Sequence, residues 1–188
     1  MFSKEELNIL ETKKNILEKK DIDLIITDLD DTIFSTKEAI EKDIRKWRRW
    51  EEGNKYIVEV IWIKKFIDKF YLNKIYPKSI VSKLRKNHDL IITAWYKDIQ
   101  LEKLKACKLT HINYRIVSNP EEKIIETIRY IVNKLNFIPS KIIIYEDRPK
   151  FFIEYKDFLE KFLWIKIKII YVEMINNEIE PKLTQIYT

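Results

Sequence analysis

The sequence predicts an α/β fold in which a five-stranded parallel sheet is flanked by helices. Short, continuous aliphatic runs alternate with stretches of helical periodicity, and acidic or hydroxyl side chains end or follow three of the runs. Continuous apolar strands separated by helices are typical of βαβ units, whose parallel sheets are buried on both faces. The runs cover residues 24–27, 90–93, 112–117, 141–145 and 167–172.

Helices are expected before, between and after these runs. Ser3 and Glu6 have the spacing of a capping box and predict a helix to about residue 19. The long stretch between the first two runs also has helical periodicity, with breaks expected near Gly53 and Pro77. Further helices are expected over about residues 98–106, 121–135 and 149–162.

Composition is compatible with one domain over residues 1–188. Gly53 is the only glycine and the five prolines are scattered, so we expect no flexible linker. The net charge of +6 comes from 36 basic against 30 acidic residues. This mild excess allows a polyanionic partner but does not require one.

Several kinds of site are excluded by residue counts. A single cysteine, Cys107, rules out an intramolecular disulfide framework and a cysteine-based zinc site, and His88 and His111 are too few for a histidine cluster. No apolar run approaches the length of a membrane span, and the charged N-terminus does not resemble a signal peptide. We therefore expect a cytoplasmic protein.

Two carboxylates, Asp28 and Asp30, follow the first aliphatic run. In an extended segment they point to the same side, and a hard cation such as Mg²⁺ would keep both ionised. One carboxylate could then attack phosphorus while the other moves the proton of the leaving group. Taken alone, the pair would more often be a helix cap or a solvated turn. The aliphatic strand before it and the Thr-Ile-Phe sequence after it favour the catalytic interpretation.

Residues 26–34, ITDLDDTIF, resemble motif I of the haloacid dehalogenase (HAD) superfamily, an aliphatic strand followed by DxDxT. The resemblance implies a Rossmann-like HAD fold and a magnesium-dependent phosphatase. It makes Asp28 the nucleophile and a metal ligand. Asp30 becomes the general acid/base, with its backbone carbonyl at the metal. Thr32 would brace this loop among the substrate-binding residues.

Two further motifs of that superfamily have counterparts in this chain. Thr93 ends the run LIIT, as in motif II, where a hydroxyl donates to a phosphate oxygen. Lys123 opens a predicted helix and matches the motif III lysine that neutralises nucleophile and phosphate. For Lys123 the alternative is an ordinary solvated lysine, because the chain is rich in them.

The fourth motif is an acidic pair, Glu146 and Asp147, after the run KIIIY. The resemblance makes both candidate magnesium ligands, with Asp147 favoured for direct contact. The sequence YEDR around them resembles the Swiss Army knife RNA repair-like branch and the 3′-phosphatase domains of phage polynucleotide kinases. Phe151 stands where that branch often has histidine. Arg148 would bind substrate phosphate or pair with a core carboxylate, and both roles stay open.

An insertion over about residues 36–76 would form a small helical cap over the site. It contains the basic and aromatic stretch RKWRRW at residues 45–50, which could bind phosphates and stack bases. A buried helical face with solvated Arg48 and Arg49 explains the stretch equally simply, and we favour it. A small cap leaves an open site, which suits a nucleic-acid end.

Together these features predict a Mg²⁺-dependent phosphomonoester hydrolase that forms a phosphoryl-aspartate on Asp28. A phosphorylated nucleic-acid end is one candidate substrate, and a nucleotide or sugar phosphate is the alternative. The other class of function considered is a HAD-like binding module without turnover, which would have no need for both Asp28 and Asp30.

Overall fold

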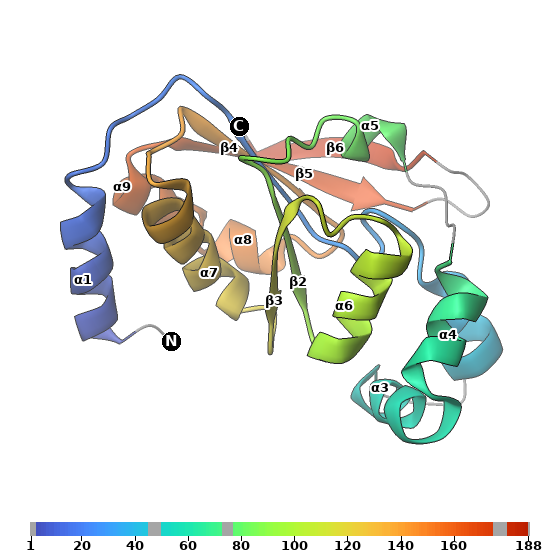
Figure 1. Ribbon diagram of the computed structural model, residues 1–188. Coiled ribbons are helices and arrows are strands. Elements are labelled where there is room, and N and C mark those ends of the chain that lie inside the picture. The colour runs from blue at the N-terminus through green and yellow to red at the C-terminus, as the bar shows by residue number, and fades with distance from the viewer. Residues whose placement is uncertain (1–2, 45–49, 73–76, 175–179, 188) are drawn as a thin grey trace.

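One mixed sheet of six strands organises the molecule, in the order β3-β2-β1-β4-β5-β6 (Figure 1). The computed structural model describes residues 3–44, 50–72, 77–174 and 180–187. β1 to β5 run parallel, and β6 pairs antiparallel with β5. The strands are β1 (Leu24–Thr27), β2 (Leu90–Ala94), β3 (Asn113–Val117), β4 (Lys141–Glu146), β5 (Lys166–Glu173) and β6 (Lys182–Tyr187).

The prediction of five all-parallel strands is therefore wrong at one edge of the sheet. All five aliphatic runs form strands, but β6 adds a sixth in the opposite direction. Its sequence, KLTQIY, is mixed polar and apolar, and most of its described side chains are exposed. An edge strand with such a composition gives little hydrophobic signal, because only its pairing with β5 favours the extended form.

The central strands are buried on both faces, which explains their continuous apolar sequences. Every residue of β1 and β2 is buried. Side chains alternate across a strand, so Leu24 and Ile26 join one core cluster while Ile25 joins another. Burial of an aliphatic side chain contributes about 1.5–3 kcal/mol, so this alternation stabilises both faces of the sheet at once.

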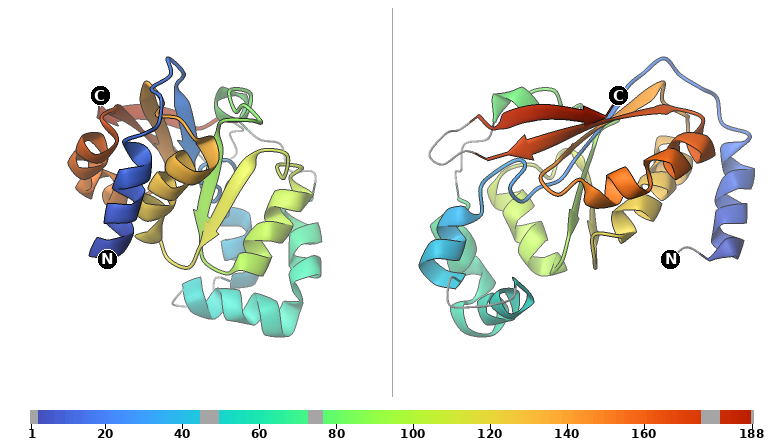
Figure 2. Two further views of the ribbon diagram at one scale, coloured as in Figure 1. Left: turned by 60° about the vertical axis from the view of Figure 1, so that its left-hand side comes forward. Right: turned by 180° about the vertical axis from the view of Figure 1, so that it is seen from behind.

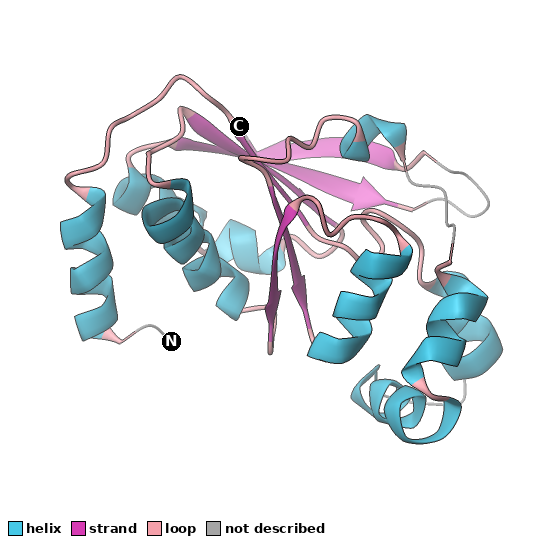
Figure 3. Cartoon of the chain, in the orientation of Figure 1, coloured by secondary structure: helices cyan, strands magenta, loops and turns pink. Residues whose placement is uncertain are grey.

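Helices cover the two faces of the sheet (Figure 2). One core cluster joins the sheet to α1, α7, α8 and α9, and another joins it to α4 and α6. Figure 3 shows the same division, with helices on both sides of the strands. These helices are α1 (Lys4–Lys14), α4 (Ile63–Phe70), α6 (Lys97–Ala106), α7 (Glu122–Tyr130), α8 (Lys150–Glu154) and α9 (Lys156–Leu163).

The N-terminal helix begins as expected but is shorter. Ser3 Oγ accepts a hydrogen bond from the Glu6 backbone N–H at 3.1 Å, which caps α1. The Glu6 carboxylate accepts a hydrogen bond from Arg129 Nε at 2.6 Å, and this contact ties α1 to α7. The helix ends at Lys14 and not near residue 19, which had been the expectation.

Between β1 and β2 the chain is mainly helical, as predicted. The break expected near Pro77 is present, because Pro77 is the N-cap of the helix Lys78–Val81, but the break expected at Gly53 is not. Gly53 lies inside a helix and is buried. A glycine costs a helix interior about 1 kcal/mol, which packing can offset, so the expected break is absent there. The helical run is interrupted at Trp62 instead, where φ is 73°. The elements are α2 (Lys37–Ala39), η1 (Ile40–Ile44), α3 (Trp50–Tyr56), η2 (Ile57–Ile61), α4 and α5 (Lys78–Val81), with π-helical η1 and η2.

The predicted helix over 121–135 consists of α7 and a final π-helical turn, η3 (Ile131–Leu135). The helix predicted over 149–162 is divided into α8 and α9 at Tyr155. Within the described residues, no helix has the length and apolar character needed to cross a membrane. The basic residues Arg45, Arg48 and Arg49 of the insertion lie outside the described residues.

Candidate functional site

The candidate site lies where the carboxyl ends of three neighbouring strands meet. β1 has β2 on one side and β4 on the other, so the chain turns to opposite sides of the sheet from this strand. Ligands of open α/β sheets bind at such switch points. Thr27 is in register with Tyr145, and the Asp28 N–H donates a hydrogen bond to the Tyr145 carbonyl at 3.0 Å. This pairing brings Asp28 beside Glu146 and Asp147.

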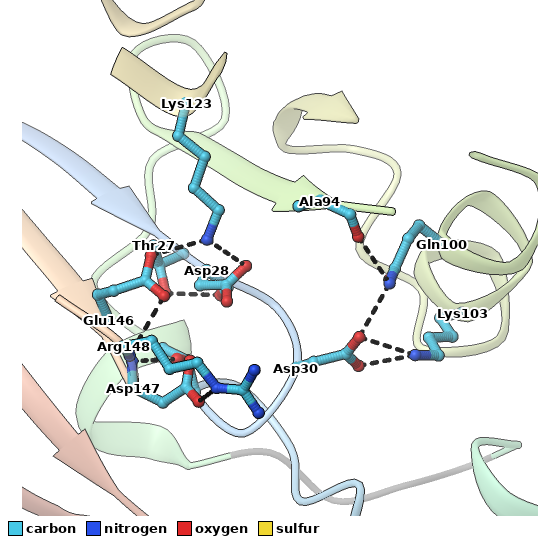
Figure 4. A network of polar contacts seen from close by, with 11 residues as sticks. Thr27, Asp28, Asp30, Ala94, Gln100, Lys103, Lys123, Glu146, Asp147 and Arg148 are labelled. Carbon is cyan, nitrogen blue, oxygen red and sulfur yellow. Dashed lines mark hydrogen bonds and ion pairs between the residues drawn. The ribbon is translucent and has the colours of Figure 1, made fainter. Parts of the chain in front are cut away.

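Three carboxylates form a cluster at this point (Figure 4). One carboxylate oxygen each from Asp28, Glu146 and Asp147 lies within 4.8 Å of the other two. Asp28 and Glu146 are buried, and Asp147 is partly buried. Like charges at this separation repel strongly where water is excluded, so the cluster requires a positive partner.

Lys123 supplies part of that positive charge. It lies in the first turn of α7, fully buried, with Nζ 2.8 Å from Glu146 Oε2 and 3.1 Å from Asp28 Oδ1. Burial alone would lower the pKa of its ammonium, but the Asp28 and Glu146 charges outweigh burial and raise that pKa. Lys123 therefore stays protonated, and the solvated-lysine alternative does not describe it.

One ammonium does not balance three carboxylates. Burial, followed by the charge of Asp28, raises the pKa of Glu146 well above its ordinary value. The same two causes raise the pKa of Asp147 to about 7. Without a further cation, Glu146 and Asp147 consequently bind protons more readily than ordinary carboxyl groups do.

A divalent cation fits this donor set. Carboxylate oxygens are the ligands that Mg²⁺ and Ca²⁺ prefer. Asp28 Oδ1 is buried and, although it lies at ion-pair distance from Lys123, it accepts no well-aligned hydrogen bond from the described residues. A buried carboxylate oxygen that accepts no well-aligned hydrogen bond is suited to act as a metal ligand.

Asp30 is held away from this cluster. Both of its carboxylate oxygens lie 2.8 Å from Lys103 Nζ, and Gln100 Nε2 donates to Oδ2 at 2.9 Å. Figure 4 shows its carboxylate turned toward α6, while that of Asp28 faces Lys123. The two aspartates therefore do not present their carboxylates to one point, as the extended spacing had suggested. The structure separates them because the loop turns after Asp28.

Sequence reasoning missed Lys103 and Gln100, although a faint signal exists. They are three residues apart on α6, and both are buried together with Ile99 and Leu104. A lysine on the apolar face of a helix needs a buried anionic partner. The helical pattern could have flagged Lys103, but it could not have identified Asp30 as that partner.

The loop that follows β1 is braced from within. Asp31 has a positive φ of 54°, and its carboxylate accepts hydrogen bonds from the backbone N–H and the hydroxyl of Thr36. Thr32 is fully buried, and its hydroxyl accepts a hydrogen bond from the Asp147 N–H at 3.2 Å. Thr32 does not line the cavity described below, so its position suits bracing and not substrate contact.

A cavity of about 390 Å³ opens above the cluster. Asp28, Asp30 and Lys123 line it, together with both acids that follow β4. Thr93, near the end of β2, is buried and also lines the cavity. The remaining lining is largely apolar and includes Ile40, Trp95 and Phe151.

Arg148 lines the same cavity but is differently placed. Its side chain is 79% exposed, and its Nε lies 3.4 Å from Asp147 Oδ2. The pairing with a carboxylate is therefore present, and the exposed guanidinium is also open to a ligand. Both roles considered for this residue are compatible with the geometry.

Comparison of the chain with protein-family models, curated proteins and solved structures gave no match. The site is therefore interpreted from its own geometry and chemistry.

Proposed function

We propose that this protein is a Mg²⁺-dependent phosphomonoester hydrolase in which Asp28 forms a phosphoryl-aspartate. The single observation that carries the proposal is the setting of Asp28 in an open cavity. A buried carboxylate there has an ammonium at 3.1 Å and two further carboxylates within ligand distance of a shared cation. Such a carboxylate has both the charge partners and the access that a nucleophile needs.

The sheet supports the finer assignment to a Rossmann-like, HAD-type fold. β1 to β5 are parallel in the order β3-β2-β1-β4-β5, which is the order of doubly wound nucleotide-binding sheets. The proposal is further supported by the DxDxT segment after β1, the threonine near the end of β2, the lysine of α7 and the acidic pair at the end of β4. The helical insertion at about 36–76 would act as the cap.

Asp28, Glu146 and Asp147 would hold the metal, and Asp28 would attack phosphorus. As the Asp28–phosphorus bond forms, the bond to the leaving oxygen breaks. Thr93 would donate to a phosphoryl oxygen, and Lys123 would balance developing negative charge. Bound Mg²⁺ would supply charge neutralisation and polarisation of the phosphoryl group.

Asp30 would carry the protons. For this it leaves its ion pair with Lys103 and takes up a proton from solvent, which it then donates to the leaving oxygen. In the second step it accepts a proton from the water that attacks the phosphoryl-aspartate, and phosphate is released with Asp28 restored. One residue thus acts first as acid and then as base.

The substrate is proposed to be a phosphomonoester, with a phosphorylated nucleic-acid end and a small nucleotide or sugar phosphate as the two candidates. The exposed Arg148 guanidinium beside the cavity suits the phosphates of either. The basic stretch that favoured nucleic acid from sequence lies outside the described residues.

The proposal is tested by phosphate release in Mg²⁺ from acetyl phosphate and from a set of phosphorylated metabolites and oligonucleotide ends. Rapid quenching followed by borohydride reduction should convert Asp28 to homoserine, which peptide mass spectrometry detects. Tight binding of these compounds with no release of phosphate would instead support a binding module.

A further inference from the structure

Trp95 directly follows β2 and lines the cavity that contains the proposed catalytic residues. Thr93 and Ala94, just before it, are 2% and 5% exposed, whereas Trp95 is 38% exposed and lines the cavity. A tryptophan that served only the core would bury this surface, because its ring is among the largest apolar groups available. Here more than a third of the residue faces outward at the site.

The backbone of Trp95 adopts a conformation that is unfavourable for its side chain. Its φ is 79°, a region that glycine enters freely and that a bulky residue enters only at a cost in free energy. The turn is fixed by a hydrogen bond from the Trp95 N–H to the Val117 carbonyl at 2.9 Å. Residues with strained backbone conformations cluster at functional sites, where the function requires the side chain at that position.

Other side chains around Trp95 make the cavity suitable for an apolar ring attached to a phosphate. Ile40 and Phe151 come from separate elements and line the same cavity as Trp95. The charged lining contains the basic Lys123 and Arg148, which suit a phosphate, and six acidic residues, among them the three of the carboxylate cluster, which suit a cation bound with that phosphate. A ligand that satisfies both parts carries a phosphoryl group and a flat aromatic ring.

We infer that Trp95 is a specificity-determining residue that stacks with a nucleobase in the leaving group of the substrate. This inference rests on the proposed function and names its substrate class more closely, as phosphorylated nucleotides. The base can belong to a free nucleotide or to the terminal residue of a nucleic acid. Stacking of a base on an aromatic side chain corresponds to a change of roughly 5-fold to 150-fold in affinity.

The test compares substrates that differ only in the base. Adenosine 5′-phosphate is set against ribose 5-phosphate, and adenosine 3′-phosphate against its abasic counterpart. A short oligonucleotide with the same terminal phosphate distinguishes a nucleic-acid end from a free nucleotide. In wild type, kcat/KM for at least one base-bearing compound should exceed that of its abasic partner by about tenfold or more.

Two substitutions of Trp95 separate stacking from folding. Trp95→Gly removes the ring, so the ratio of kcat/KM with and without the base should fall to near one. The substitution also removes the strain of the positive φ, so the midpoint of urea unfolding should stay the same or rise. Trp95→Phe keeps a ring and should retain much of the preference. The readout in each variant is the ratio of kcat/KM for a base-bearing compound to that for its abasic partner, which a uniform loss of activity leaves unchanged.

Trp164→Gly is the matched control. Trp164 also has a positive φ, 56°, and is 62% exposed, but it does not line the cavity. Its substitution should leave the base preference at the wild-type value. Equal loss in both glycine variants would assign the effect to general destabilisation and overturn the inference.

Failure of the proposed function is distinguishable from failure of this inference. If no compound releases phosphate in Mg²⁺, the phosphatase proposal falls, and calorimetry with the same pairs of compounds still measures the base preference. A wild-type ratio near one in both assays, or an unchanged ratio in Trp95→Gly, would show that Trp95 does not select the leaving group.

Discussion

Asp28 is the residue on which the proposed chemistry depends, and its surroundings account for its role. It is buried at the end of β1, with Lys123 on one side and the acids after β4 on the other. An uncompensated buried carboxylate would be strongly unfavourable, so Lys123 stabilises the fold as well as serving the proposed reaction.

Asp28→Asn should abolish turnover while the protein remains folded. The amide keeps the shape of the side chain but removes the attacking charge, and it lessens repulsion with Glu146 and Asp147. We expect phosphate release to fall by at least about a thousandfold, the scale on which loss of an essential catalytic group is seen. Circular dichroism should show an unchanged spectrum. A variant that keeps most of its activity would disprove the covalent mechanism.

Asp147 makes the stability of the metal-free protein depend on pH. Its pKa is raised to about 7 from an ordinary value of 3.8, so between these values the folded state binds more protons than the unfolded state. The contribution of Asp147 to stability in EDTA should therefore be largest at about pH 4 and below, and it should be lost as pH rises to 7, by on the order of 1–3 kcal/mol. Denaturant titrations across that range measure the slope.

Asp147→Asn provides the comparison for that slope. Because asparagine does not titrate, the variant should lose much of the pH dependence and be more stable than wild type at pH 8 in EDTA. Glu146, whose pKa is also raised, should leave a residual slope. A slope equal to that of wild type would mean that Asp147 does not carry the effect.

At the scale of elements, α6 has a role that its surface does not reveal. Its Lys103 is 1% exposed and holds the Asp30 carboxylate, while Gln100 donates to that carboxylate and to the Ala94 carbonyl. The helix thus links the loop after β1 to the end of β2. Through this link α6 positions the proposed proton carrier.

Lys103→Met should weaken both stability and turnover. The methionine preserves much of the apolar stem, but Asp30 loses its ion pair, and we expect a cost of about 1–3 kcal/mol in urea unfolding. The rate should fall because Asp30 is no longer held beside the cavity. The Asp30→Asn and Lys103→Met double variant should be less destabilised than the sum of the single changes.

Lys105→Met on the same helix is the control for that substitution. The side chain of Lys105 is 54% exposed, and it forms an ion pair with Glu102 at the surface. Its loss should change stability by no more than about 0.5 kcal/mol and leave turnover unchanged. Similar effects of the two lysine substitutions would remove the special role assigned to Lys103.

At the scale of the whole molecule, the candidate site joins elements that are distant in the chain. Asp28 follows β1, Lys123 belongs to α7, and Glu146 ends β4. Bringing these charges together opposes folding, whereas a bound cation offsets the repulsion. Metal binding should therefore stabilise the entire fold and not one loop.

Mg²⁺ should raise the melting temperature and be required for activity, and chelation should reverse both effects. At a concentration of about 100 times Kd, the expected stabilisation is about 2.7 kcal/mol. A variant with Glu146→Gln and Asp147→Asn should show little shift. Full activity in EDTA, or equal shifts in wild type and this variant, would reject the three acids as a metal site.

Parts of this architecture were predictable because their signals are local. Runs such as Leu24–Thr27 are continuous and aliphatic, and burial on both faces of a sheet leaves few other options for them. The acids after β1 and β4 are visible in the sequence, and parallel strands bring their carboxyl ends to one edge. β6 was missed because its pairing with β5 is a non-local interaction between strands with a weak apolar pattern.

The sequence by itself determined the alternation of strands and helices and the positions of Asp28, Thr93, Lys123, Glu146 and Asp147 in it. Only the tertiary structure decided which way the Asp30 carboxylate points, that Lys103 is its partner, and that Trp95 lines the cavity. The physical reason is the separation along the chain between the residues that interact. Strand formation follows from the hydrophobic pattern of a few adjacent residues, whereas the direction of a side chain is selected by packing and charge from segments far along the chain.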